Sequence, residues 1–276
     1  MNRLPTAKRV QIVAALVEGN SVRATCRMTG AAKGTVLKLL NDLGSVCEDY
    51  QDRTLRDLPC KRVQCDEIWT FCYAKEKNVP EGKKGRYGYG DTWVWTAICA
   101  DTKLAITWLL GLRDARTAQF FMNDLAGRLR SRVQLTTDGH ASYLTAVDEA
   151  FGGEVDYSIL VKLYGAERAG EARYSPPKCT GCRRERISGN PDRAHVSTSF
   201  VERQNLTMRM SMRRFTRLTN AFSKKAENLM NAVALHFMNY NFCRVHQTLR
   251  VTPAMEAGVM SHVWELEELV GLLDSN

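Results

Sequence analysis

The chain has 276 residues, of which 44% are hydrophobic, and it carries a formal net charge of +9 at pH 7. This length suits a small domain joined to a medium one, and the basic excess favours a polyanionic partner, nucleic acid foremost. No apolar run reaches membrane-spanning length, and nine scattered cysteines are typical of a reduced, cytoplasmic protein, so we expect no membrane partner.

The first 45 residues have the pattern of three short helices. Apolar residues recur at helical spacing over 6–17, Ser21 can cap a second helix, and a third opens at Lys33 after the turn at Gly30. This order predicts a helix-turn-helix domain over 1–45, whose third helix would enter the major groove of DNA. The residues that we expect to contact DNA from this domain are Arg23, Arg27, Lys33, Thr35 and Lys38. The alternative is a packing module with a solvated basic face.

A linker and a run of strands are expected next. Residues 46–59 are polar, poor in apolar side chains and closed by Pro59, which is typical of a linker. The following residues are rich in β-branched and aromatic side chains without a helical period. A Gly- and Lys-rich hairpin connection interrupts them over 75–90. Three strands in a row predict an antiparallel start to a sheet: 62–74, 91–100 and 103–112.

Helices and strands then alternate. An amphipathic helix is expected over 115–130, a short strand over 133–138, a helix over 141–151 and a strand over 155–165. The sequence therefore predicts an α/β fold with a mixed sheet and flanking helices. No GxGxxG or GxxxxGK[ST] motif opens a helix, which argues against a nucleotide-cofactor fold.

Three carboxylates fall on three of these elements: Asp66 in the first strand, Asp138 at the end of the short strand, and Glu202 at the start of a later helix. An ionised carboxylate on a core strand costs free energy unless it is paired or binds a metal. Carboxylate oxygens suit Mg²⁺, with Mn²⁺ as a substitute, and three of them can hold two ions that clamp a phosphodiester. The sequence therefore predicts a two-metal site.

Each acid also has another interpretation. Strand alternation sends Asp66 and Glu67 to opposite faces, so Glu67 is the alternative functional acid of that pair. Asp138 precedes a glycine and fits ordinary turn chemistry. A carboxylate such as Glu202 at a helix start is favoured by the helix dipole alone.

The order "CDEIWTF", "TTDGHASY", "STSFVERQN" on this pattern of elements resembles the ribonuclease-H-like catalytic core of DDE transposases. The tail "NYNFCRVHQTLRVTPAMEAG" is similar to the end of such domains, and the likeness covers residues from about Lys8 to Gly258. It is greatest to the insertion sequence one family, which also pairs a helix-turn-helix with a DDE core. The spacing from Asp138 to Glu202 is longer than is usual there, because residues 165–197 intervene.

The resemblance implies metal-dependent cleavage of double-stranded DNA at the ends of a transposable element and strand transfer into target DNA. Asp66, Asp138 and Glu202 would be the catalytic acids and metal ligands. The cations expected along the bound strand are Arg209, Arg213, Arg214 and Arg217. The family likeness also implies a dimer or larger homo-oligomer on the bacterial nucleoid.

The resemblance places the catalytic domain at 60–258, with a basic insertion loop at 165–197 and a C-terminal helix at 259–276. Cys179 and Cys182 have zinc-knuckle spacing, but no second such pair follows, so we do not expect structural zinc. Two other functions stay open: a non-catalytic helix-turn-helix regulator derived from a transposase, and a ribonuclease-H-like nuclease.

Overall fold

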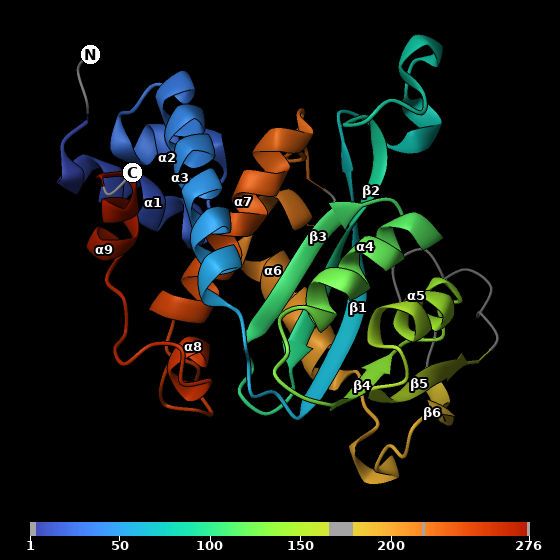
Figure 1. The fold of residues 1–276 in the computed structure, drawn as a ribbon. Coiled ribbons are helices and arrows are strands. Elements are labelled where there is room, and N and C mark those ends of the chain that lie inside the picture. Colours follow the sequence, from blue (N-terminus) through green and yellow to red (C-terminus); the bar gives the residue numbers. More distant parts are fainter. Residues whose placement is uncertain (1–3, 166–178, 217–218, 275–276) are drawn as a thin grey trace.

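The computed structural model describes residues 4–165, 179–216 and 219–274. A six-stranded sheet with helices on both faces lies beside a group of helices that come from the N-terminal and C-terminal parts of the described chain (Figure 1). Among the described residues, none of the helices combines the length and the apolar character needed to cross a bilayer.

The three N-terminal helices predicted from the sequence are present as α1 (Thr6–Val17), α2 (Val22–Thr29) and α3 (Lys33–Thr54). The Ser21 hydroxyl caps α2 by accepting a hydrogen bond from the Ala24 amide at 3.1 Å. Gly30 ends this helix with a φ of 67°, a left-handed conformation that a glycine adopts without strain.

Helix α3 is longer than expected, so the prediction of a linker over 46–59 was wrong as far as Thr54. Its second half packs on α7 (Ala226–Met238), where the Gln51 amide donates to the Ala234 carbonyl at 3.1 Å. Gly44 allows the close approach, because a Cβ there would lie 2.5 Å from the Cβ of Asn231. Only about one side chain per turn is buried in this half, and that signal was too sparse to show in the sequence.

The C-terminal tail packs against the first helix. Helix α9 (Leu266–Gly271) lies beside α1, and the Asp274 carboxylate forms an ion pair with Arg9 at 3.0 Å. A helix was predicted over 259–276, and α9 is that helix in shorter form. The N-terminal helices are thus joined to the rest of the chain through both α7 and α9.

The sheet has the order β3-β2-β1-β4-β5-β6. Its strands are β1 (Arg62–Cys72), β2 (Gly90–Cys99), β3 (Ala105–Gly111), β4 (Val133–Thr137), β5 (Val155–Tyr164) and β6 (Cys179–Ser188). The first three strands pair antiparallel, whereas β4 runs parallel to β1 and β5 parallel to β4. The α/β fold with a mixed sheet predicted from the sequence is confirmed.

Strand β6 was not predicted, because residues 165–197 were expected to form a loop. It pairs antiparallel with β5 and none of its ten residues is buried. Because the strand has no apolar face, its sequence lacks the alternation of apolar and polar residues by which strands are predicted. Its hydrogen bonds to the β5 backbone hold it in the sheet. Residues 166–178 of the expected loop lie outside the described residues.

Helices cover both faces of the sheet. Helices α4 (Ala115–Ala126) and α5 (Ser142–Phe151) lie on one face, and α6 (Ser199–Ser211) lies on the other against β1 (Figure 1). Helix α7 continues as a π-helical turn over Asn239–Cys243, and α8 (Pro253–Glu256) follows.

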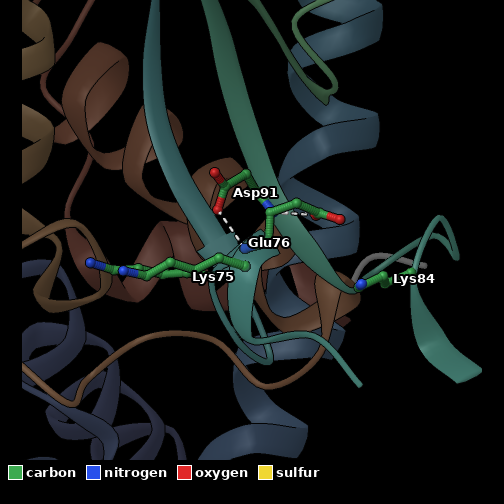
Figure 2. A pocket seen from close by; sticks show the side chains of 5 residues that line it. Lys75, Glu76, Lys84 and Asp91 are labelled. Carbon is green, nitrogen blue, oxygen red and sulfur yellow. Dashed lines mark hydrogen bonds between the residues drawn. The ribbon is translucent and has the colours of Figure 1, made fainter. Parts of the chain in front are cut away.

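The connection between β1 and β2 is the hairpin loop predicted over 75–90, and it extends beyond the sheet (Figure 1). At its base the Glu76 amide donates to the Asp91 carboxylate at 3.1 Å, and the Asp91 amide donates back to Glu76 at 3.4 Å. Lys75 and Lys84 lie around this pair (Figure 2). The reciprocal bonds fix the start of β2 against the loop.

Candidate metal centre

The register of β1 and β4 brings two of the predicted acids together. The parallel pairing ends at Gln64 opposite Thr136, and β4 itself ends one residue later. Continuing this register by two residues sets Asp66 opposite Asp138, in the opening where β4 leaves the sheet. The end of β4 therefore gives both carboxylates room to face each other.

Asp138 makes the turn that the sequence allowed as an alternative. Its Oδ1 accepts a hydrogen bond from the His140 amide at 2.9 Å, and His140 Nδ1 accepts one from the Ser142 amide at 3.1 Å. Burial, and then the charge of Arg113, lower the pKa of His140 and keep the ring neutral. The turn leaves the second oxygen of Asp138 directed toward Arg113.

Glu67 also belongs to the site. Oxygen atoms of Asp66, Glu67 and Asp138 lie within 4.8 Å of one another, and we call these three residues the carboxylate cluster. Arg113 approaches from the loop after β3, with 3.3 Å between its Nε and Glu67 Oε2 and 3.4 Å between its Nη2 and Asp138 Oδ2. Asp66 and Glu67 were weighed as alternatives, but oxygen atoms of both belong to the cluster.

The electrostatics show a shortage of positive charge. Burial first, and then the negative charges of Glu67, Asp138 and Glu202, raise the pKa of Asp66 to about 7, although a hydrogen bond from the Glu67 amide opposes the shift. The pKa of Glu67 is also raised to about 7, by burial first and then by Asp138, although Arg113 and Tyr143 oppose the shift. Near neutral pH, Asp66 and Glu67 therefore take up protons, because Arg113 alone does not balance their negative charge.

Helix α6 is docked on this end of β1 by two amide side chains. The Gln64 carbonyl oxygen accepts hydrogen bonds from the first-turn amides of Phe200 at 2.8 Å and Val201 at 3.2 Å. One turn on, Asn205 Nδ2 donates to Asp66 Oδ2 at 2.8 Å, while its buried Oδ1 has no hydrogen bond among the described residues. Asn205 was not predicted as a site residue; its position three residues after Glu202, on the same helix face, was the available signal.

Glu202 lies at the margin of the site and outside the carboxylate cluster. Its carboxylate pairs with Lys162 of β5 and accepts a hydrogen bond from the Thr198 hydroxyl at 2.5 Å. Burial works to lower the pKa of Lys162, but Glu202 outweighs it and the net shift is upward. Glu202 is close enough to raise the pKa of Asp66. Its role as a metal ligand stays a prediction.

The predicted basic track along α6 is only partly in place. The helix ends at Ser211, with Arg209 half-buried on its last turn and Arg213 exposed just beyond it. Arg214 turns inward instead, where its Nη1 donates to the Ser223 hydroxyl at 2.6 Å and burial lowers its pKa to about 10. The expectation that it follows the DNA strand conflicts with this orientation. Arg217 lies outside the described residues.

The cations predicted on the N-terminal helices are mostly exposed. Arg23, Arg27 and Lys33 face solvent, and Thr35 is half-buried. Lys38 is exposed as well, and its ammonium group pairs with Asp42 one turn along α3 at 2.5 Å. Their contact with DNA stays a prediction.

Cys179 and Cys182 both lie exposed on β6. His195, the only further zinc ligand nearby in the sequence, has its Nδ1 at 2.6 Å from Nη1 of Arg62. Among the residues that the structure describes, neither cysteine nor His195 belongs to a group of three potential metal ligands.

No protein-family model matches this sequence, and no curated protein is significantly similar to it. Some solved structures do match. A Mos1 transposase paired-end complex with left transposon end has a TM-score of 0.24 and 14% identity over 58% of this chain and 60% of that chain. A piggyBac transposase synaptic complex with hairpin DNA has a TM-score of 0.42 and 12% identity over 98% of this chain and 70% of that chain. The match thus spans about three-fifths of the Mos1 chain. Likenesses of this degree carry no argument about function, so the interpretation depends on the site's own residues.

Proposed function

We propose that the chain is a DDE-type transposase, which cuts double-stranded DNA at the ends of a transposable element and joins them to target DNA with the help of divalent metal ions. The observation that carries the proposal is the carboxylate cluster, with acids from β1 and the end of β4 within 4.8 Å of one another and Asn205 of α6 bonded to Asp66. The motifs that resemble DDE transposases contain these same residues. Membership of the insertion sequence one family is part of the proposal.

The residues present fit a hard divalent cation. All the donor atoms are carboxylate oxygens, which Mg²⁺ and Mn²⁺ prefer. The raised pKa values of Asp66 and Glu67 mark a place where added positive charge lowers the free energy. Arg113 supplies only one such charge, at long distances from two acids.

In this mechanism Asp66 and Asp138 would hold the divalent cations, two in the full site, and Glu202 of α6 would be the third acid, although it is paired with Lys162 here. Bound Mg²⁺ or Mn²⁺ would supply Lewis-acid activation of the phosphodiester. Asn205 fixes the orientation of Asp66 through its hydrogen bond. Arg209 and Arg213, on and just after the end of α6, offer positive charge to the strand beyond the acids. Joining two ends requires two sites, so we propose a homodimer or larger assembly.

The other two functions explain less. A non-catalytic regulator has no need of a carboxylate cluster in which burial, and then neighbouring carboxylates, raise the pKa values of Asp66 and Glu67. A general nuclease has no need of the three N-terminal helices with exposed Arg23, Arg27 and Lys33. Both features together favour an enzyme that acts at defined DNA ends, in the cytoplasm on the nucleoid.

The test is cleavage and joining of a duplex that carries the inverted repeats flanking the coding region. Asp66→Asn and Glu202→Gln should each abolish the Mn²⁺-dependent reaction while the protein still binds the duplex in a gel-shift assay. Normal cleavage by Asp66→Asn would refute the proposed mechanism. Absence of inverted repeats around the coding region would favour the regulator.

A further inference from the structure

Glu67 is the most enclosed acid of the carboxylate cluster. Its side chain is 1% exposed, compared with 35% for Asp138. Its Oε1 is fully buried and makes no hydrogen bond among the described residues. A buried carboxylate oxygen without a donor costs free energy, so its position calls for a missing partner.

The neighbours of Glu67 do not supply that partner. The Tyr143 hydroxyl lowers the pKa of Glu67 as a nearby hydrogen-bond donor does, but the positions of the atoms do not make a well-formed hydrogen bond, and both this hydroxyl and Oε1 are buried without one among the described residues. Arg113 reaches only the other oxygen, at 3.3 Å, which is long for a charge-assisted bond. It is also shared with Asp138 and 41% exposed, so a stronger cation can displace it into solvent.

Glu202 differs in each of these respects. Its two oxygens have partners, one in Lys162 and one in Thr198. It is 37% exposed and lies outside the group of acids whose oxygens approach within 4.8 Å. In the DNA-free protein, Glu202 therefore has less to gain from a metal ion than Glu67 has.

We propose that Glu67 is a metal ligand, and that Asp66, Glu67 and Asp138 form the first divalent-cation site in the absence of DNA. This inference rests on the proposed function and adds a fourth acid to its three. The cation takes the place of Arg113 between Glu67 and Asp138, and Oε1 of Glu67 gains the partner that it lacks. Glu202 stays with Lys162 until DNA is bound.

Isothermal titration of the full-length, DNA-free protein with Mn²⁺ tests the assignment. Glu67→Gln should weaken Mn²⁺ binding by about tenfold or more, the scale seen when groups around a metal site are removed. Glu202→Gln should change the affinity by less than about twofold, as should Glu149→Gln, a matched control on the exposed face of α5. Asp66→Asn should abolish binding.

The outcomes separate the inference from the proposed function. If Glu67→Gln binds Mn²⁺ like the wild type while Glu202→Gln loses it, the inference is wrong and the DDE mechanism stands. If Asp66→Asn binds normally, the proposed function itself fails. Circular dichroism checks the fold of each variant. Should Glu67→Gln not fold, Glu67→Asp, which keeps the charge but withdraws the oxygens, replaces it in the same titration, and unchanged affinity there counts against the inference.

Discussion

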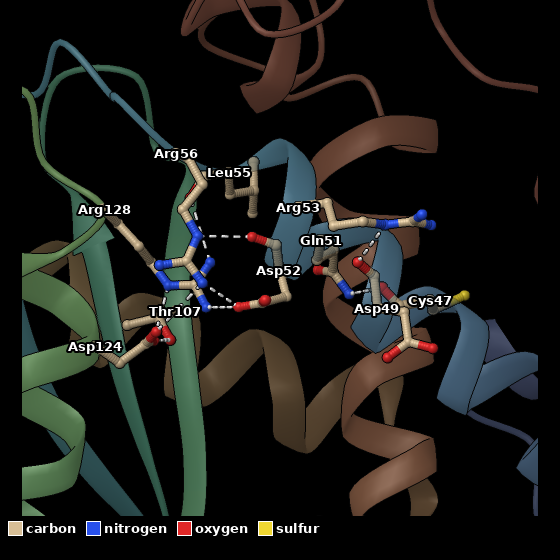
Figure 3. Close-up of polar contacts among 10 residues, drawn as sticks. All are labelled: Cys47, Asp49, Gln51, Asp52, Arg53, Leu55, Arg56, Thr107, Asp124 and Arg128. Atoms are coloured by element: carbon tan, nitrogen blue, oxygen red, sulfur yellow. Dashed lines mark hydrogen bonds and ion pairs between the residues drawn. The ribbon is translucent and has the colours of Figure 1, made fainter.

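Two groups of charged residues, one at the end of α3 and one at β1 and the end of β4, show how differently this chain treats its acids. At the end of α3, Asp52 and Asp124 face Arg56 and Arg128, which we call the arginine-balanced cluster (Figure 3). Arg128 pairs with Asp52 at 2.6 Å and with Asp124 at 2.7 Å, and it also donates to the Leu55 carbonyl at 3.2 Å. Each acid there has a cation at short distance.

The carboxylate cluster has the opposite balance. Three acids share one arginine, and both contacts of Arg113 exceed 3.2 Å. The arginine-balanced cluster joins α3 to α4 and so supports the fold, whereas the carboxylate cluster destabilises the metal-free protein. An excess of buried acids over cations, and not the presence of acids alone, therefore distinguishes the candidate metal site.

The same substitution in the two clusters should give the largest contrast. Asp138→Asn removes an acid from the carboxylate cluster, and DNA cleavage should fall by about 1,000-fold or more, as when a charge-stabilising group is lost from an active site. Asp124→Asn removes an acid from the arginine-balanced cluster, and cleavage per folded molecule should stay within about twofold. Initial rates on an end-sequence duplex measure both. Equal losses in the two variants would show that the comparison is mistaken.

Arg128 should contribute more to stability than any cation of the carboxylate cluster. Its side chain is 8% exposed, so Arg128→Met removes a buried partner of Asp52 and Asp124. The free energy of unfolding should fall by about 2 kcal/mol. The loss is not larger because both acids are partly exposed and regain contact with water. Urea denaturation measures the change. Arg130→Met is the matched control, since its pair with Asp57 is exposed on both sides and its loss should leave stability nearly unchanged. Similar effects of both variants would contradict the assignment of Arg128.

Neutralising an acid of the carboxylate cluster should stabilise the metal-free protein at high pH. The folded-state pKa of Glu67 is about 7, above its ordinary value of 4.5. A raised folded-state pKa of an acid means that stability is full below pH 4.5 and is lost as the pH rises through about 7. Glu67→Gln lacks this loss, so above pH 7 it should be more stable than the wild type, by on the order of 1 kcal/mol.

Thermal unfolding in the presence of a chelator, at a pH below 4.5 and at a pH above 7, measures this difference in stability. Below pH 4.5 the two proteins should have nearly the same stability, because both side chains are then neutral in both states. A Glu67→Gln variant less stable than the wild type at high pH would show that Arg113 already satisfies the acid.

The sequence predicted that Asp66 and Asp138 converge, and their oxygen atoms do lie close together, because the parallel pairing of β1 with β4 sets the register of a residue inside β1 and one just after β4. The signal failed where position depends on distant packing. Arg214 has the composition of a DNA contact, but a turn after Ser211 directs it to Ser223. Lys162 gave no sign of its pairing with Glu202, because nearly forty residues separate them along the chain.

Elements with sparse apolar signals were missed for the same reason. The second half of α3 buries little more than Cys47 and Gln51, and only α7, far along the chain, explains why it is helical. The inclusion of Glu67 depended on three-dimensional geometry, since strand alternation alone sends it away from Asp66. What a residue pairs with, and not its type, decides which acids are left for a metal.

The smallest effect is expected at Arg113, the counterpart of Arg128 in the comparison. Its side chain is 41% exposed and its contacts with Glu67 and Asp138 are 3.3 and 3.4 Å long, so it forms no strong ion pair. Arg113→Met should therefore change the free energy of unfolding by less than about 0.5 kcal/mol near neutral pH. At that pH Asp66 and Glu67, whose pKa values are about 7, can take up protons in place of the lost cation. Its removal should also strengthen Mn²⁺ binding by about threefold, because the ion no longer displaces a cation. Urea denaturation and Mn²⁺ titration measure the two quantities on one preparation. A loss of stability as large as that of Arg128→Met would mean that Arg113 is a structural counter-ion, and that the two clusters differ in geometry but not in kind.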